Sequence, residues 1–93
     1  MNSRRFTERY RGSSHKDAFT TGARISRDSY RMGNGNLCDK SSFVIVDTSK
    51  VLIDDEAIWG CEFMKDIFDV YGPAGCVYLG GETYLFFGVS AVE

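Results

Sequence analysis

The stretch CVYLGGETYLFFGVS, residues 76–90, is the strongest indication of the fold. It consists of two apolar runs separated by Gly80 and Gly81. Glycine adopts the positive φ angles of a tight hairpin turn at little steric cost. The stretch therefore predicts two antiparallel strands, with Gly80-Gly81 as the loop and Val77 opposite Tyr84.

This register makes both faces of the hairpin apolar, because residues alternate between faces along a strand. One predicted face holds Val77, Leu79, Tyr84 and Phe86, and the other holds Cys76, Tyr78, Leu85, Phe87 and Val89. A single helix covers only one face, so the other meets the N-terminal segment, a partner or a second copy of the chain. Tyr84 and Phe86 are therefore candidate partner-binding residues, and a homo-oligomer is one way to cover them.

The residues before the hairpin predict two further strands and a helix. SFVIVDTSKVLID, residues 42–54, is typical of two short strands around a turn at residues 47–50. Asp54 is a good N-cap, and Gly72-Pro73 ends the helix after residue 70 or 71. The predicted fold class is α+β: a small β-β-α-β-β domain whose antiparallel sheet packs on one amphipathic helix.

The predicted helix has an acidic face. At 100° per residue, Asp55, Glu62, Asp66 and Asp69 lie within an arc of about 60°, and Trp59 lies beside it. An aromatic side chain next to a charged rim is typical of protein interfaces. These five residues are candidate partner-binding residues. The alternatives are plain solvation of the acidic face and packing of Trp59 over the sheet edge.

The N-terminal third of the chain is basic, although the net charge is −2. Residues 1–32 contain eight Lys and Arg against three Asp and Glu, whereas residues 33–93 contain three against ten. Residues 1–23 are rich in Arg, Ser, Thr and Gly and predict an irregular arm. Residues 23–32 predict an edge strand, and the GNGN at residues 33–36 is a break. We therefore divide the chain into a basic arm, residues 1–36, and an α+β body, residues 37–93.

Four arginines in the predicted arm are candidates for contact with an acidic partner or with nucleic acid: Arg4, Arg5, Arg9 and Arg11. Phe6 and Tyr10 lie among them. Arginine next to aromatic side chains suits phosphate contact and base stacking. The acidic body would repel a phosphate backbone, so the arm is the part expected to contact nucleic acid.

No set of residues predicts catalysis, a metal or a cofactor. His15 is the only histidine, and Cys38, Cys61 and Cys76 lack the paired spacing of zinc ligands. The GNGN segment lacks the third glycine of a dinucleotide loop. An odd number of cysteines beside apolar runs indicates free thiols in a reducing, cytoplasmic compartment. No apolar run is long enough to span a membrane, and no secretory signal is evident.

These features predict a small non-enzymatic protein-binding module, an inhibitor or regulator that docks on a larger nucleoprotein complex through an acidic helix face and a basic arm. In size and charge pattern the chain is similar to small phage-encoded inhibitors, anti-CRISPR proteins among them. This similarity assigns no site residues. One alternative is a structural subunit of a virion or other assembly, and another is a nucleic-acid-binding protein acting through the N-terminal arm.

Overall fold

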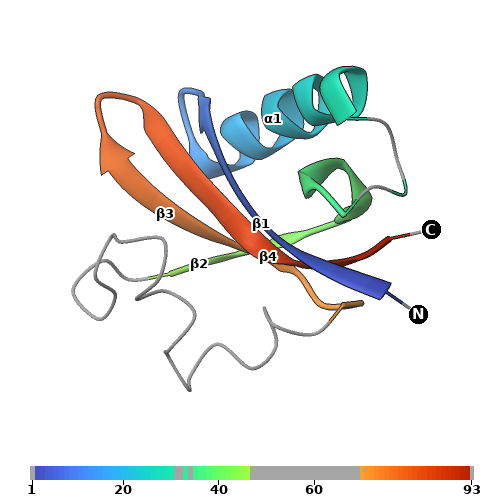
Figure 1. The fold of residues 1–93 in the computed structure, drawn as a ribbon. Coiled ribbons are helices and arrows are strands. Elements are labelled where there is room, and N and C mark those ends of the chain that lie inside the picture. Colours follow the sequence, from blue (N-terminus) through green and yellow to red (C-terminus); the bar gives the residue numbers. More distant parts are fainter. Residues whose placement is uncertain (1, 31–32, 34, 47–69, 93) are drawn as a thin grey trace.

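The computed structural model describes residues 2–30, 33, 35–46 and 70–92 (Figure 1). They form a four-stranded mixed sheet with the spatial order β1-β4-β3-β2. Along the chain the elements are β1 (Asn2–Arg11), helix α1 (His15–Tyr30), the 3-10 helix η1 (Leu37–Asp39), β2 (Phe43–Ile45), β3 (Ala74–Gly80) and β4 (Thr83–Val92). The prediction of a small α+β fold is confirmed. The sheet is not wholly antiparallel, because β2 runs parallel to β3.

The predicted hairpin is present as β3 and β4, but its register differs by one residue from the prediction. Tyr78 pairs with Tyr84, and Val77 pairs with Leu85. The loop is Gly81-Glu82, whose φ angles of 58° and 60° are both positive, as in a type I′ turn. An irregularity in the pairing between Tyr78 and Gly80 accommodates the one-residue shift in register. Because a shift of one residue exchanges the two faces of a strand, the predicted grouping of Val77 with Tyr84 was wrong.

The N-terminal segment is a ten-residue strand, so the prediction of an irregular arm was wrong. Every residue of β1 from Asn2 to Arg11 pairs with β4, antiparallel, from Val92 to Thr83. Phe6 and Tyr10 pack in the core beneath α1, and Glu8 lies between them on the same face. A carboxylate at this inward position interrupts the apolar alternation that would have predicted a strand.

Helix α1 follows β1 directly, so the edge strand predicted at residues 23–32 was also wrong. The helix begins at a reciprocal cap. The Ser14 hydroxyl accepts the Asp17 backbone N–H at 3.1 Å, and the Asp17 carboxylate accepts the Ser13 backbone N–H at 2.9 Å. The bond to Ser14 satisfies an N–H group that the first turn leaves without a helical partner, and the bond from Ser13 fixes the residue that precedes the cap.

The buried side of α1 is a narrow stripe of small residues, Ala18, Gly22 and Ser26. Their spacing of four places them on one side of the helix. At Gly22 the helix comes so close to the sheet that an added Cβ would lie 2.4 Å from Cδ2 of Tyr10. The small residues therefore allow the helix backbone to lie directly on β1.

Helices α1 and η1 cover one face of the sheet (Figure 1). Phe86 is at the centre of this core, and the rings of Phe19 and Phe43 pack against it with centroid distances of 5.8 and 6.2 Å. On the opposite face, the side chains of Val77, Leu85 and Phe87 are 1%, 0% and 0% exposed. Both faces of the hairpin are therefore buried. The N-terminal segment extends the sheet as β1 and does not cross the second face.

Part of the prediction lies outside the described residues. The first predicted strand of residues 42–54 is present as β2, but the second strand and the predicted helix, up to residue 69, are not described. The division of the chain at residue 36 stays a prediction. The strands β1 and β4 come from the two sides of that division and pair along their full lengths.

Candidate anion-binding groove

The structure separates the sequence-predicted site residues into three groups. Asp55, Trp59, Glu62, Asp66 and Asp69 lie outside the described residues. Tyr84 and Phe86 are buried under α1, with exposures of 6% and 0%, and the structure leaves neither available to a partner. The four N-terminal arginines, Arg4, Arg5, Arg9 and Arg11, are all exposed on β1.

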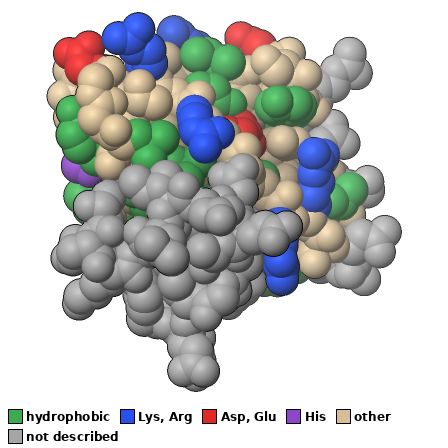
Figure 2. Space-filling view, turned by 60° about the vertical axis from the view of Figure 1, so that its left-hand side comes forward, with side chains coloured by type: hydrophobic (Ala, Val, Ile, Leu, Met, Phe, Trp, Pro, Cys, Tyr) green, Lys and Arg blue, Asp and Glu red, His purple; other side chains and the backbone are tan. Residues whose placement is uncertain are grey.

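Basic side chains dominate the exposed charge of β1 and α1. Seven Lys and Arg side chains in these two elements are exposed, whereas only two carboxylates are. The seven are Arg4, Arg5, Arg9, Arg11, Lys16, Arg24 and Arg27. The third carboxylate, that of Glu8, is buried and forms hydrogen bonds inside the protein. Figure 2 shows separate Lys and Arg side chains on the face in view, among hydrophobic side chains and several Asp and Glu side chains.

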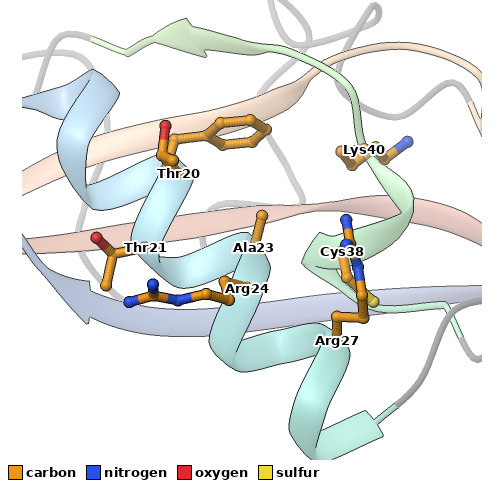
Figure 3. Close-up of a pocket in the computed structure, with 8 residues that line it drawn as sticks. Thr20, Thr21, Ala23, Arg24, Arg27, Cys38 and Lys40 are labelled. Carbon is orange, nitrogen blue, oxygen red and sulfur yellow. The ribbon is translucent and has the colours of Figure 1, made fainter.

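Two adjoining hollows lie between α1 and the segment that leads from η1 to β2. The first, of about 460 Å³, is lined by Phe19, Thr20, Thr21, Ala23, Arg24, Arg27, Cys38 and Lys40 (Figure 3). The second, of about 390 Å³, is lined by Lys16, Phe19, Thr20, Ser41, Ser42 and Phe43. Phe19 and Thr20 line both hollows, which therefore adjoin, and we call the two together the α1 groove. No described residue that lines it is acidic.

One wall of the α1 groove is a single side of the helix. Lys16, Thr20, Arg24 and Arg27 follow one another at spacings of four, four and three residues, which places them on one side of α1. Arg24 and Arg27 have no hydrogen-bond or ion-pair partner among the residues that the structure describes. In Figure 3 the Arg27 side chain extends beside Cys38, while Arg24 extends along the helix toward Thr21. Both guanidinium groups keep their donors available to a ligand.

The other wall is held in place by buried hydrogen bonds. The Ser26 hydroxyl on α1 accepts the Cys38 backbone N–H at 3.2 Å, and the Glu8 carboxylate accepts the Leu37 backbone N–H at 2.9 Å. Lys40 belongs to this wall, and its ammonium group donates to the carbonyl oxygen of Val70 at 2.9 Å. The wall is therefore anchored to α1, to β1 and to the segment that precedes β3.

The GNGN break precedes this wall and is confirmed as a turn. Gly33 and Gly35 have positive φ angles of 88° and 77°. Their backbone N–H groups donate to the two carboxylate oxygens of Asp39 at 2.8 and 3.0 Å. Because Asp39 already occupies these donors, the turn has no N–H groups left for an external phosphate at these two positions.

The titratable side chains near the core are poor nucleophiles. Burial raises the pKa of the Cys38 thiol, and burial also raises the pKa of the Cys76 thiol to about 12. Burial and the hydrogen bond to Glu8 raise the pKa of the Tyr10 hydroxyl above its usual value. A thiol held in its protonated form is a weak nucleophile and a weak metal ligand. The His15 ring packs edge-on against Tyr84, with a centroid distance of 4.8 Å.

Sequence reasoning missed the residues of the α1 groove. The missed signal is the pattern Ser-x-x-Asp at residues 14–17, a helix-capping sequence. Taken with the four-residue spacing of Lys16, Thr20 and Arg24, it would have predicted a helix with one basic side. Contributions from Ser41, Ser42 and Phe43 follow only from the tertiary structure, because they approach the helix across the core.

Within the described part of the chain, no three His, Cys, Asp or Glu side chains come together as candidate metal ligands. None of the helices in that part is long and apolar enough to cross a membrane. No protein-family model, no curated protein and no solved structure matches the chain.

Proposed function

We propose that the protein is a non-enzymatic binding module, an inhibitor or regulator, that docks on a larger nucleoprotein complex with the basic surface of β1 and α1 toward its anionic component. The observation that carries the proposal is the excess of exposed Lys and Arg over exposed carboxylates on these two elements. Arg5, Arg9 and Arg11 lie on the face of β1 opposite α1, because Phe6 and Tyr10 face the helix and residues alternate along a strand. The cations therefore flank the β1 edge of the sheet on both sides, and a polyanion would be attracted to this edge and repelled by the acidic remainder of the chain.

The proposal is strengthened because the arginines lie on ordered secondary structure, whereas the sequence predicted that they lie in an irregular arm. The arginines of β1 sit on a strand that pairs with β4 over ten residues, and those of α1 sit on a capped helix. Their backbone is already ordered, so binding costs side-chain entropy but no backbone entropy, and more of the interaction energy appears as affinity. Charge complementarity also speeds association and sets the orientation of the partners.

The acidic face of residues 55–69, with Trp59, remains part of the proposal as a second contact surface for a basic protein. Changing Asp66 and Asp69 to lysine together is expected to weaken docking on the complex and to leave thermal unfolding unchanged. Cys38 and Cys76 are buried and form no disulfide within the described part of the chain, which supports a proposed reducing, cytoplasmic location. The protein would then act in the manner of the small phage-encoded inhibitors that it resembles in size and charge.

Direct binding of nucleic acid is the second candidate function, and the α1 groove favours it. In this groove Arg24 and Arg27 lie beside hydroxyl and aromatic side chains. A nucleic-acid-binding protein would bind isolated strands with an affinity that falls steeply as salt is raised. A module that docks chiefly on protein would require the assembled complex.

The test is affinity purification of the tagged protein from its native host, with nuclease-treated and untreated lysates. The variant carries glutamine in place of Arg4, Arg11, Arg24 and Arg27, all exposed side chains. We expect the wild-type protein to capture a defined nucleoprotein complex and the variant to capture about tenfold less or lower, because several charge-assisted contacts are lost. Equal capture by both proteins would contradict the role of the basic surface. A stable oligomer in light scattering, without any captured complex, would favour a structural subunit instead.

A further inference from the structure

We infer that the α1 groove is a binding site for one nucleotide, either free or as a unit of a single strand. The phosphate would occupy the first hollow and the base the second. This inference rests on the proposed function, because it assigns the nucleic-acid contact of the basic surface to one place. It also makes a separate claim, that the site recognises the two chemically different halves of a nucleotide.

The first hollow has the chemistry of a phosphate site. Arg24 and Arg27 lie three residues apart on the same side of α1, so their Cβ atoms are about 5–6 Å apart, and both line this hollow. Their side chains extend in different directions in Figure 3, so Arg24 would have to change rotamer for both guanidinium groups to contact one anion. Guanidinium groups match the oxygens of a phosphate with two parallel hydrogen bonds. The hydroxyls of Thr20 and Thr21 line the same hollow and supply further donors.

The second hollow has the chemistry of a base site. The rings of Phe19 and Phe43 are 5.1 Å apart, and both are partly buried, so each gives part of its surface to the hollow. Ser41 and Ser42 are exposed at its rim and carry hydroxyls that both donate and accept hydrogen bonds. Aromatic surface next to such groups is how proteins commonly hold an unstacked base. Lys16 adds a positive charge on the same side.

The two hollows are connected in the order that a nucleotide requires. Thr20 and Phe19 line both, so the two hollows adjoin and one ligand could contact the arginines and the phenylalanines at the same time. The walls are held by the Ser26–Cys38 and Glu8–Leu37 hydrogen bonds. The backbone of these walls therefore needs little rearrangement on binding, which reduces the entropic cost.

An acidic peptide is the competing ligand. Its carboxylates would satisfy Arg24 and Arg27 but would leave the aromatic surface of Phe19 and Phe43 unused. A nucleotide uses both hollows. The experiment therefore has to separate anion binding in the first hollow from base binding in the second.

The first measurement is fluorescence anisotropy with labelled single strands of about 12 thymidine or uridine nucleotides, a length suited to a small binding domain. The groove variant is Arg24→Gln with Arg27→Gln. Its matched control is Arg4→Gln with Arg11→Gln, which makes the same charge change at exposed positions of β1. We expect the groove variant to lose about tenfold or more in affinity, because charge-assisted hydrogen bonds are removed. The control variant is expected to lose no more than about threefold, since it changes only the general electrostatic attraction.

The second measurement uses amide NMR spectra with adenosine monophosphate, inorganic phosphate and an aspartate-rich peptide as separate probes. We expect the monophosphate to shift the amides of Thr20, Ser41 and Ser42. Phe43→Leu keeps an apolar side chain but removes the ring. It is expected to weaken monophosphate binding several-fold and to leave the response to inorganic phosphate unchanged. A merely structural role of Phe43 would alter both responses equally.

The outcomes are distinct. Binding of the monophosphate and the strands supports a site for free and strand-borne nucleotides, and binding of strands alone, at the same amides, supports a site for a strand. Equal losses in the groove and control variants would overturn the inference. It would also be overturned if inorganic phosphate or the acidic peptide competed as well as the monophosphate.

If nucleotides bind but no nucleoprotein complex is captured, the inference stands and the proposed function fails. If the wild type and the groove variant capture a complex equally and nucleotides do not bind, the function stands and the inference fails.

Discussion

Glu8 is a carboxylate at a position of β1 that faces the core, and it serves as an acceptor for the neighbouring loop. Its side chain is 9% exposed. One oxygen accepts the backbone N–H of Leu37 at 2.9 Å and the side-chain amide of Asn36 at 3.3 Å, and the other accepts the hydroxyl of Tyr10. A buried carboxylate is tolerated when hydrogen bonds replace its lost hydration. Glu8 thus connects the edge strand to the wall of the α1 groove.

Replacing Glu8 by leucine is expected to lower the free energy of unfolding by about 2–4 kcal/mol, because the buried donors of Leu37, Asn36 and Tyr10 lose their acceptor. Replacement by glutamine keeps one acceptor oxygen and is expected to cost about 1 kcal/mol. Urea unfolding followed by circular dichroism measures both values. A leucine variant as stable as the wild type would show that these bonds add no net stability.

The buried thiol of Cys76 is expected to make the free energy of unfolding depend on pH in the alkaline range. Its side chain is fully buried, and burial raises its pKa from 9.0 to about 12. Below pH 9 the thiol is protonated in both the folded and the unfolded chain. Between pH 9 and pH 12 the unfolded chain releases the proton while the folded chain keeps it, which favours unfolding. The contribution of Cys76 to stability is therefore fully present below pH 9 and is lost as the pH rises toward 12.

We predict that the free energy of unfolding of the wild type falls more steeply with pH above 9 than that of Cys76→Ala. The difference in slope is at most about 1.4 kcal/mol for each pH unit. The two proteins are compared by the slope of the free energy of unfolding against pH, because the alanine variant is also less stable at every pH through lost packing. Urea unfolding at intervals between pH 8 and pH 11 gives both slopes, and parallel curves would contradict the raised pKa.

At the level of secondary structure, α1 is stabilised by its close contact with the sheet as much as by its own sequence. Its buried side consists of Ala18, Gly22 and Ser26. Small side chains bury little apolar surface, but they allow the helix to approach the strands closely. The aromatic rings of Phe19 and Tyr10 then supply the larger contacts at the sides of the stripe.

Gly22→Ala is expected to destabilise the protein, although alanine is a better helix former than glycine by about 1 kcal/mol. An added Cβ would lie 2.4 Å from Cδ2 and 2.7 Å from Cγ of Tyr10, which requires the ring or the helix to move. We expect a net loss of about 1–3 kcal/mol, the usual range for overpacking. Ser29→Ala, at an exposed position of the same helix, is the control and should be neutral or slightly stabilising. A stabilised Gly22→Ala variant would indicate that α1 lies farther from β1.

For the whole molecule, β1 and α1 both build the core and carry exposed positive charge. The strand pairs with β4 over ten residues, and the helix covers the core and forms one wall of the α1 groove. Within the described part of the chain, the exposed cations lie on these same two elements. The basic character of the N-terminal third is thus a property of the folded domain and cannot be removed by truncation without affecting the fold.

Deletion of residues 2–11 is expected to abolish cooperative unfolding, because it removes Phe6 and Tyr10 from the core and leaves β4 without one of its neighbours. Thermal unfolding followed by circular dichroism is the measurement. The variant with Arg4→Gln and Arg11→Gln has the same chain length as the wild type and should unfold normally. An unchanged unfolding transition in the deletion variant would indicate that residues 2–11 are an arm independent of the folded domain.

The sequence by itself determined that residues 76–90 form a hairpin, though not its register, that a strand begins the stretch 42–54, that GNGN is a break, and that the fold is α+β, because glycine positions and runs of apolar residues are local signals. The tertiary structure decided the rest of the described fold. In β1 the apolar alternation is interrupted by Glu8, whose burial depends on donors 28 and 29 residues away. In α1 the buried stripe is so small that its pattern shows little apolar periodicity. The α1 groove, likewise, exists only because packing brings Ser42 and Phe43 to the side of a helix that ends more than ten residues earlier.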